Sequence, residues 1–283
     1  MAIKLVAILL VLLACHVLPE LARLRDHSWW RAWLRGLGPA NAAAALVLGV
    51  GLPVLACVVL QWALRGTWFG LLEFLLAVAV LYYCWGPRDL ERDVEAIGKA
   101  PDAGARLAAA QVLRRDGDTA ELPPTAENLV SATFGAALAR WFGVLFWFVV
   151  LGPCGALLYR LAQLLVGSST PEAAGMVRKF AALLDWLPAH LMALALALAS
   201  NFDAVFTTWR DYHRAHPQGY ASLDAGFLDA IARASVAADV AAADTDADAQ
   251  NPAIALEEAM VLVRRVLVVW LTLIALIVLG GFF

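Results

Sequence analysis

A few ionisable residues interrupt segments that are otherwise apolar, and these are the first candidates for chemistry. They are Glu73, Arg160, Asp185 and His190. Such residues are costly in hydrocarbon, so each indicates a functional site or a buried ion pair. Asp185 and His190 flank Pro188, which tends to break a helix, and we predict that they line a polar pocket. The alternative is that Asp185 forms a structural ion pair with Arg160 or Arg178.

The apolar stretch that ends at Tyr159 is the predicted wall of this pocket. It contains Gly152 and Gly155, which lack side chains and would allow a neighbouring helix to approach closely. Arg160 follows directly, and we expect it to be the partner of Asp185.

Signatures of common catalytic and metal sites are absent from the sequence. It has no P-loop, no G-x-S-x-G and no H-E-x-x-H. His213 and His216 form an H-x-x-H that ends at Pro217, which we interpret as a solvated loop rather than a metal site. The Asp-rich run 244–248 lacks the glycine and the final glutamate of a calcium loop. We therefore predict no metal and no cofactor.

The composition shows which kind of protein must position these residues. Hydrophobic residues make up 62% of the 283 residues and charged residues 16%, and the mean hydropathy is +0.73. A soluble domain is about 45–50% apolar and about 25% charged. The chain is therefore predicted to be an integral membrane protein, and its net charge of −3 argues against a nucleic-acid partner.

Apolar runs of about 18–20 residues can cross a bilayer. The sequence predicts four such spans and a weaker fifth: 42–60, 68–85, 141–159, 266–283 and, as the weaker candidate, 180–200. Five spans place 17 of the 21 Lys and Arg residues on the cytoplasmic side, which is the expected bias. The N-terminal run 5–15 is short for a span. The predicted fold is thus an all-α, polytopic helical bundle with about five spans, a short N-terminal apolar helix and cytoplasmic helices.

The polar segments complete the predicted organisation. Residues 21–37 have the Trp and Arg spacing of a helix in the headgroup region, or of a connector packed on the bundle. Residues 234–251 are rich in Ala and Asp and are predicted to be a disordered linker. The predicted divisions are an N-terminal part (1–41), a two-span hairpin (42–85), a cytoplasmic helical segment (86–140), a membrane core (141–200), a cytoplasmic segment with an acidic linker (201–265) and a last span (266–283).

Three motifs carry a resemblance to a known family. They are Ala105-Arg106…Arg115-Asp116…Ala126-Glu127-Asn128, Gly152-Pro-Cys-Gly155-Ala-Leu-Leu-Tyr159-Arg160, and Asp185-Trp-Leu-Pro188-Ala-His190-Leu191. Together they resemble the CobD/CbiB superfamily of membrane proteins, which use ATP to attach an aminopropanol-type arm to a corrin ring. The ligand-binding candidates are Glu127, Asn128, Gly152, Gly155, Tyr159, Arg160, Asp185, Pro188 and His190.

The sequence also departs from the motifs of those enzymes. No acidic residue follows Asn128 within a few positions, the paired Asp of the last motif becomes Leu184-Asp185, and its Arg becomes His190. An ATP-dependent ligase needs carboxylates to hold Mg²⁺ on the phosphates. These losses argue against the ligase reaction.

Within the superfamily the pattern is similar to AmpE. The shared features are the apolar N-terminal helix, the aromatic and basic segment Trp29–Arg35, the pair Phe146-Trp147, the D-W-x-P motif at Asp185–Pro188 and a C-terminal span. The resemblance implies a regulatory protein of the bacterial inner membrane, linked to peptidoglycan recycling and β-lactamase induction. We therefore expect no catalysis, and as partners the bilayer and either a cytoplasmic protein or a small cell-wall-derived ligand. The alternative is a CobD/CbiB-type ATP-dependent cobinamide-phosphate synthase; a transporter is disfavoured because no inverted repeat is visible.

Overall fold

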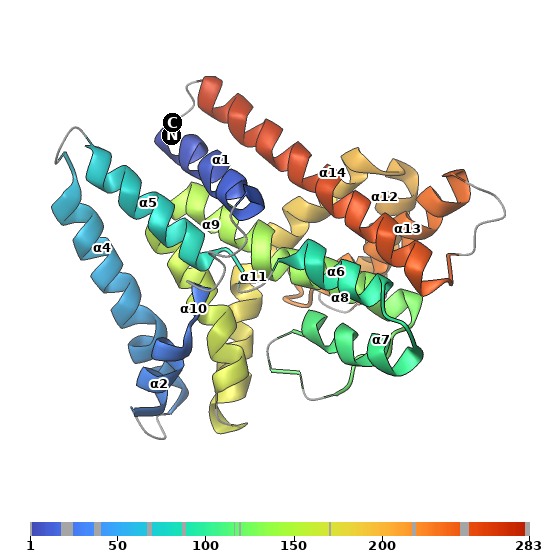
Figure 1. Cartoon of the computed structure of the whole chain (residues 1–283), viewed down its shortest axis with the longest axis horizontal. Coiled ribbons are helices and arrows are strands. Elements are labelled where there is room, and N and C mark those ends of the chain that lie inside the picture. Colours follow the sequence, from blue (N-terminus) through green and yellow to red (C-terminus); the bar gives the residue numbers. More distant parts are fainter. Residues whose placement is uncertain are drawn as a thin grey trace. The chain divides into compact units, whose positions relative to one another are not determined.

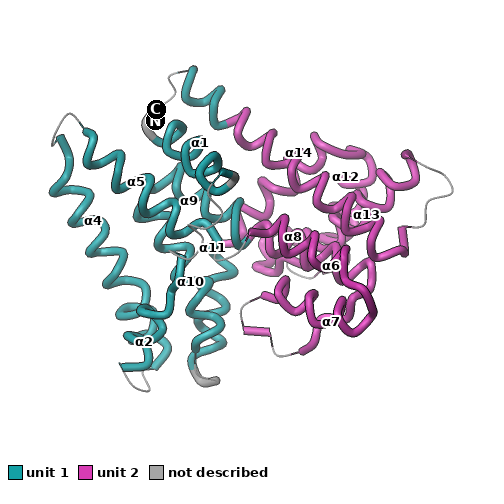
Figure 2. Tube along the Cα trace, in the orientation of Figure 1, with its two compact units in different colours: residues 1–87, 139–184, 274–283 teal, residues 88–138, 185–273 magenta. Residues whose placement is uncertain are grey.

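The protein is built from α-helices (Figure 1). The computed structural model describes residues 2–17, 25–36, 41–66, 70–86, 89–115, 117–118, 120–169, 171–216, 219–243 and 249–280. These residues contain no β-strand, so the all-α prediction is confirmed. They form two compact units (Figure 2). Unit 1 comprises Met1–Pro87, Ala139–Leu184 and Ile274–Phe283, and unit 2 comprises Arg88–Leu138 and Asp185–Leu273.

Unit 1 is organised around one helix, α10. Its helices are α1 (Ala2–Val17), α2 (Ser28–Gly36), α3 (Ala42–Leu46), the π-turn η2 (Val47–Gly51), α4 (Leu52–Leu64), α5 (Leu71–Cys84), the π-turn η5 (Leu138–Phe142), α9 (Gly143–Leu151), α10 (Pro153–Ser168) and the first half of α11 (Pro171–Ala199). Helix α10 packs against α4, α5 and α9, and α1 packs against α5. A side chain at Gly155 would lie 2.2 Å from the carbonyl oxygen of Trp147, so glycine is what permits the close α9–α10 contact.

Unit 2 contains the amphipathic helices and the second half of α11. Its helices are α6 (Leu90–Gly98), α7 (Ala103–Ala110), the 3₁₀ turn η4 (Gln111–Leu113), α8 (Ala126–Ala137), α12 (Phe202–Ala215), η6 (Gly219–Ala221), α13 (Gly226–Ala243) and most of α14 (Pro252–Leu279). Helix α13 packs against both α8 and α12. Side-chain caps fix where the helices begin: Asp102 accepts the amide of Ala105 at 2.7 Å, and Thr125 accepts that of Asn128 at 3.4 Å.

Several helices are suited to a membrane, and the chain is a multi-pass membrane protein. Four in the described ranges are long and apolar enough to cross: Ala42–Leu64, Ala126–Leu151, Ala173–Ala199 and Pro252–Leu279. Helix α4 leaves large apolar side chains such as Leu55 and Val59 more than half exposed, as a lipid-facing helix does. The apolar helices Lys4–Cys15 and Leu71–Cys84 are shorter. The predicted span 68–85 is thus only a short helix, and residues 68 and 69 lie outside the described part.

The predicted span 141–159 is not one helix. Gly152 has φ +75° and ψ −156°, a conformation that ends α9 and starts α10. Only glycine adopts this backbone without strain, because it has no Cβ. The apolar helix instead extends backward from Leu151 to Ala126, through a π-turn at 138–142.

Pro188 does not break its helix, contrary to the prediction. Helix α11 runs from Pro171 to Ala199 without interruption. Proline removes the hydrogen bond to the carbonyl four residues earlier, which belongs to Leu184. That carbonyl accepts a hydrogen bond from Trp147 Nε1 at 3.1 Å. Because a side chain from α9 replaces the missing bond, the helix can continue.

One predicted helical segment, 21–37, is described from Arg25 onward and is packed on its unit, and the predicted linker is more ordered than its composition suggested. In α2, Trp30 is fully buried and donates to the carbonyl of Gly49 at 2.9 Å, which fits the connector interpretation, while Trp29 stays 55% exposed. Leu37, at the end of that prediction, lies outside the described residues. The predicted linker 234–251 is helical as far as Ala243, and the Asp-rich run 244–248 is not described.

The α4–α10 contact in unit 1 can be tested by oxidation. The Sγ atoms of Cys57 and Cys154 lie 3.6 Å apart, and both side chains are buried. A membrane-permeant oxidant is expected to join them, because thiols in contact need only a small shift to reach disulfide geometry. Mass spectrometry of digested protein should find the linked peptides in the wild type and not in Cys57→Ser. Two free thiols after oxidation of the folded protein would contradict this packing.

Candidate functional site

The predicted site residues are divided between the two units. Unit 1 contains Gly152, Gly155, Tyr159 and Arg160, and unit 2 contains Glu127, Asn128, Asp185, Pro188 and His190. The predicted pocket, and the expected pair of Asp185 with Arg160, would join residues of both units. Both therefore stay predictions.

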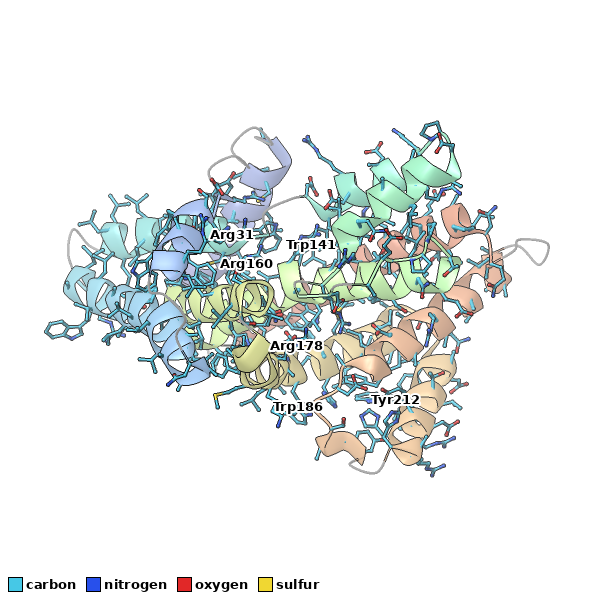
Figure 3. The ribbon with its side chains drawn as sticks, turned by 90° about the horizontal axis from the view of Figure 1, so that it is seen from below. Arg31, Trp141, Arg160, Arg178, Trp186 and Tyr212 are labelled. Carbon is cyan, nitrogen blue, oxygen red and sulfur yellow. The ribbon has the colours of Figure 1, made fainter. Side chains whose placement is uncertain are left out.

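In unit 1 the motif residues are packing residues. Tyr159 is fully buried, and a Cβ at Gly143 would lie 2.1 Å from its ring, so the ring occupies the space that this glycine leaves on α9. Arg160, on the next position of α10, is only 3% exposed (Figure 3). A guanidinium at that depth places positive charge inside the unit.

In unit 2 His190 belongs to an aromatic cluster that the sequence analysis missed. The cluster consists of Trp186, His190, Trp209, Tyr212, His213, Tyr220 and Phe227. Figure 3 labels two of its members, Trp186 and Tyr212. The His190 ring lies 4.6 Å from Trp186 and 4.5 Å from Phe227. Its Nδ1 is 2.7 Å from the carbonyl oxygen of Trp186, which can only accept, so Nδ1 carries the proton.

Of the H-x-x-H motif, His213 lies within α12 and belongs to the same cluster, while His216 directly follows the end of the helix. His213 is buried and stacks on Tyr220 at 4.1 Å, and His216 stacks on Tyr212 at 4.0 Å. The spacing of Trp209, Tyr212 and His213 along one face of α12 was the available signal. These rings pack on one another; Trp209, His213 and Phe227 are buried, while Tyr220 is 52% exposed.

Charged side chains alternate in sign along the contact between α8 and α13. In order they are Glu127, Arg233, Asp229 and Arg115, which we call the charged row. Arg233 Nη1 lies 4.0 Å from Glu127, and Arg115 Nη2 lies 3.3 Å from Asp229. Asp229 and Arg233 are four residues apart and share one face of α13. Glu127 and Arg115 come from two separate parts of the first sequence motif, so folding brings the motif together here.

One end of the charged row, Arg115, packs against α8 at a glycine. Gly135 on α8 is buried, and a Cβ there would lie 2.9 Å from Arg115 Nε. The guanidinium of Arg115 therefore lies directly on the helix backbone. Burial raises the pKa of Asp229, and the neighbouring Arg115 and Arg233 partly offset that rise. Glu127, whose side chain is 61% exposed, is the accessible carboxylate of the row.

This arrangement is suited to a phosphate-bearing substrate. Two guanidinium groups present planar, always-charged donors of the kind that phosphate oxygens accept. No three metal-ligating side chains meet within the described ranges. Mg²⁺, however, is usually held by one or two carboxylates together with substrate phosphates. The residues therefore fit Mg²⁺ that arrives with a nucleotide, with Glu127 as the carboxylate nearest to solvent.

The sequence analysis missed Asp229 and Arg233. They lie in a segment that was interpreted only as a cytoplasmic block, outside the three motifs. Their spacing of four residues on a helical segment was a visible signal. It could not show that α8 would be the helix opposite them.

Comparisons with known proteins bear on the family. The family model for CobD/Cbib protein matches residues 14–243. A curated relative, the cobalamin biosynthesis protein CobD of Chromobacterium violaceum, is 31% identical over 191 residues. That alignment covers 64% of this chain and 57% of the relative, so the chain spans little more than half of the relative's length. No solved structure matches.

These matches correct the expected function. AmpE-type signalling without catalysis is contradicted, because both matches point to the cobalamin-biosynthesis branch, which was the alternative. The expectation that the protein is not an enzyme is wrong for the same reason. The error came from weighing lost acidic positions within the motifs alone. With a model match over 14–243, the chain belongs to the CobD/CbiB family.

Proposed function

We propose that this protein is a CobD/CbiB-type enzyme of cobalamin biosynthesis in the bacterial inner membrane. It would use ATP to join an aminopropanol-type arm to a carboxyl group of a corrin, giving cobinamide phosphate when the arm carries a phosphate. The family match supports this proposal. The charged row is the structural observation that links the proposed function to particular residues. In it, the motif residues Arg115 and Glu127 both contact helix α13.

The charged row would serve the ATP-dependent part of the reaction. A carboxylate is a poor electrophile, so ATP must first convert it to an activated acyl group. Arg115 and Arg233 would neutralise phosphate charge as it develops, because preorganised cations stabilise such transition states. Glu127 would orient the Mg²⁺ that accompanies the nucleotide.

The acidic positions missing from the motifs have a structural counterpart in this scheme. Asp229 lies one helical turn from Arg233 and 3.3 Å from Arg115, and so adds a second carboxylate to the row. It comes from α13, beyond the last motif. A count of carboxylates within the motifs therefore underestimates the number of carboxylates in the folded charged row.

An assay of the purified protein in lipid nanodiscs tests the proposal. A corrin acid, aminopropanol phosphate and Mg-ATP are supplied, and the amide product is measured by mass spectrometry. We expect product that requires both ATP and protein. A thermal unfolding transition first shows that the preparation is folded. If this folded protein then forms no product from aminopropanol or its phosphate, the proposed function is wrong.

A further inference from the structure

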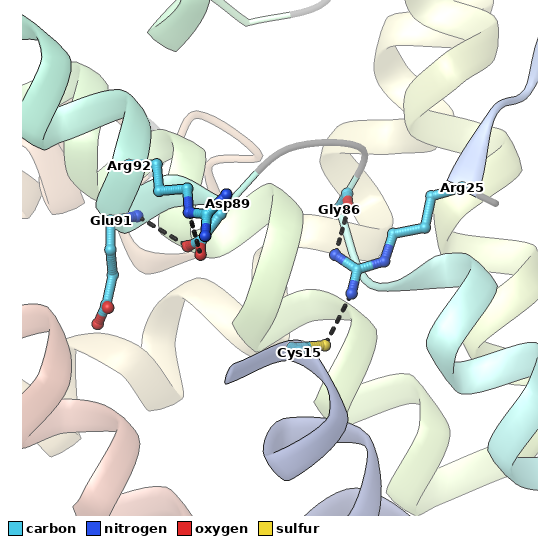
Figure 4. Close-up of polar contacts among 6 residues, drawn as sticks. All are labelled: Cys15, Arg25, Gly86, Asp89, Glu91 and Arg92. Carbon is cyan, nitrogen blue, oxygen red and sulfur yellow. Dashed lines mark hydrogen bonds and ion pairs between the residues drawn. The ribbon is translucent and has the colours of Figure 1, made fainter. Parts of the chain in front are cut away.

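Unit 1 contains two buried basic side chains in one short segment, away from the charged row. Arg25 is 4% exposed and His27 is 2% exposed. The Arg25 guanidinium donates to the carbonyl of Gly86 at 3.3 Å and to Cys15 Sγ at 2.8 Å (Figure 4). It also lies 4.4 Å above the ring of Tyr82. All three contacts are with neutral groups, so none balances the charge.

The nearest carboxylate in the sequence, Asp26, is engaged elsewhere. One of its oxygens accepts the backbone amide of Ser28 at 2.9 Å, and the other accepts the Ser28 hydroxyl at 2.6 Å. Within the described ranges, no ion pair of Arg25 with a carboxylate is found. Burying a guanidinium without a counter-charge is costly, so a negative group is expected beside it.

Buried polar atoms without a hydrogen-bond partner occur on this segment and on α5, whose Tyr82 and Tyr83 rings the segment contacts. Among the described residues they include Arg25 Nε, Tyr82 Oη and His27 Nε2. The first is an N–H donor, the second carries an O–H, and the third donates in the neutral tautomer that holds the imidazole proton on Nε2. Buried polar groups are nearly always bonded in native proteins, and an exception indicates a missing water or ion.

The surroundings favour an anion over water. Burial, and secondly the positive charge of Arg160, lower the pKa of His27 to about 4. The buried Arg160 thus contributes positive potential close to His27, whose ring also lies 4.5 Å from that of Tyr83. Several donors beside the buried Arg25 guanidinium suit an anion with several acceptor oxygens, and phosphate is the common biological one.

We propose that Arg25, together with Tyr82 and His27, binds a phosphate group in unit 1. The carbonyl that Arg25 contacts belongs to Gly86, where a Cβ would lie 3.0 Å from the Arg140 side chain, so a larger residue at this position would crowd Arg140. The phosphate could belong to a water-soluble phosphate monoester or to a lipid headgroup, since α5 is an apolar helix that ends just before Gly86. The site does not depend on the proposed enzymatic reaction.

The experiment measures binding of inorganic phosphate to delipidated protein in detergent. Thermal unfolding is followed as phosphate replaces chloride at constant ionic strength, because a ligand that binds only the folded state stabilises it. We expect phosphate to raise the unfolding temperature of the wild type. Tyr82→Phe, which removes one hydroxyl, should weaken the apparent affinity about tenfold, as loss of a hydrogen bond to a charged group does.

The matched control is Arg35→Gln on the exposed face of α2, which removes the same charge and should leave the phosphate effect unchanged. Arg25→Gln should abolish the stabilisation by phosphate. If Arg25→Gln does not fold, Tyr82→Phe still tests the proposal. Equal phosphate effects in wild type and Tyr82→Phe, or no phosphate effect at all, would overturn the proposal.

A second arm identifies the source of the phosphate. Nanodiscs of phosphatidylglycerol or of phosphatidylcholine are compared, and lipid retained by the protein is measured by native mass spectrometry. Retained phosphatidylglycerol that is lost in Tyr82→Phe assigns the site to a headgroup. Competition by a soluble phosphate monoester in both kinds of nanodisc assigns it to a small molecule.

Discussion

Glu127→Gln is expected to lower the rate of ATP-dependent amide formation by about a hundredfold, the usual effect of removing one group that stabilises developing charge. The variant should still fold, because Glu127 is 61% exposed and its ion pair with Arg233 is 4.0 Å long. Exposed pairs of this kind contribute at most about 1 kcal/mol to stability. The measurement is the turnover rate at saturating Mg-ATP, compared with the thermal unfolding midpoint of the same preparation.

A matched control is available on α6. Glu95 is 59% exposed and pairs with Lys99, so Glu95→Gln removes the same charge from the same unit. Its turnover should equal that of the wild type. Arg233→Ala should chiefly lower kcat with Mg-ATP, because Arg233 is proposed to act on the charge of the transition state; loss of a purely structural ion pair would lower only the unfolding midpoint. If Glu127→Gln retains full turnover, the charged row is not the catalytic site.

Gly143→Ala is expected to destabilise the folded protein by about 3 kcal/mol, at the upper end of the cost of overpacking a core. The added methyl group would lie 2.1 Å from the buried ring of Tyr159, which must then move. Chemical denaturation in detergent measures the change in the free energy of unfolding.

Two further variants separate overpacking from a general effect of losing glycine. Gly175 on α11 has nothing within 4 Å of its added Cβ, so Gly175→Ala should be neutral or slightly stabilising. Combining Gly143→Ala with Tyr159→Ala should cost less than the sum of the two single changes, because the clash needs both groups. Additive costs would show that the ring and the glycine do not share this space.

Much of the fold could be predicted from local patterns. The caps at Asp102 and Thr125 mark helix starts, and the apolar runs before Leu64 and after Pro252 mark membrane helices. These features depend on neighbours within a few residues. The break at Gly152 has a local signal in Gly152-Pro153, because proline supplies no amide hydrogen and is favoured at the first position of a helix, but the positive φ of Gly152 could not be read from the sequence.

The candidate site was less predictable because it depends on contacts between distant segments. Glu127 was identified as a candidate, while its partner Arg233 was not, since 106 residues separate them. His190 was predicted to line a polar pocket from its position near Pro188, and the sequence did not show that its ring would contact those of Trp186 and Phe227. Local sequence shows which side chains are unusual, and tertiary packing determines what they face.

The bond from Trp147 to the carbonyl of Leu184 constrains the order in which substitutions can accumulate. A homologue can lose Pro188 first at little cost, because a restored amide and the indole can share the two lone pairs of that oxygen. Losing Trp147 while Pro188 remains would leave a carbonyl unbonded in an apolar helix, which lipid does not tolerate. The proline is therefore contingent on the tryptophan and not the reverse. Among relatives, lineages with this proline but without an indole or another donor at position 147 should be rare.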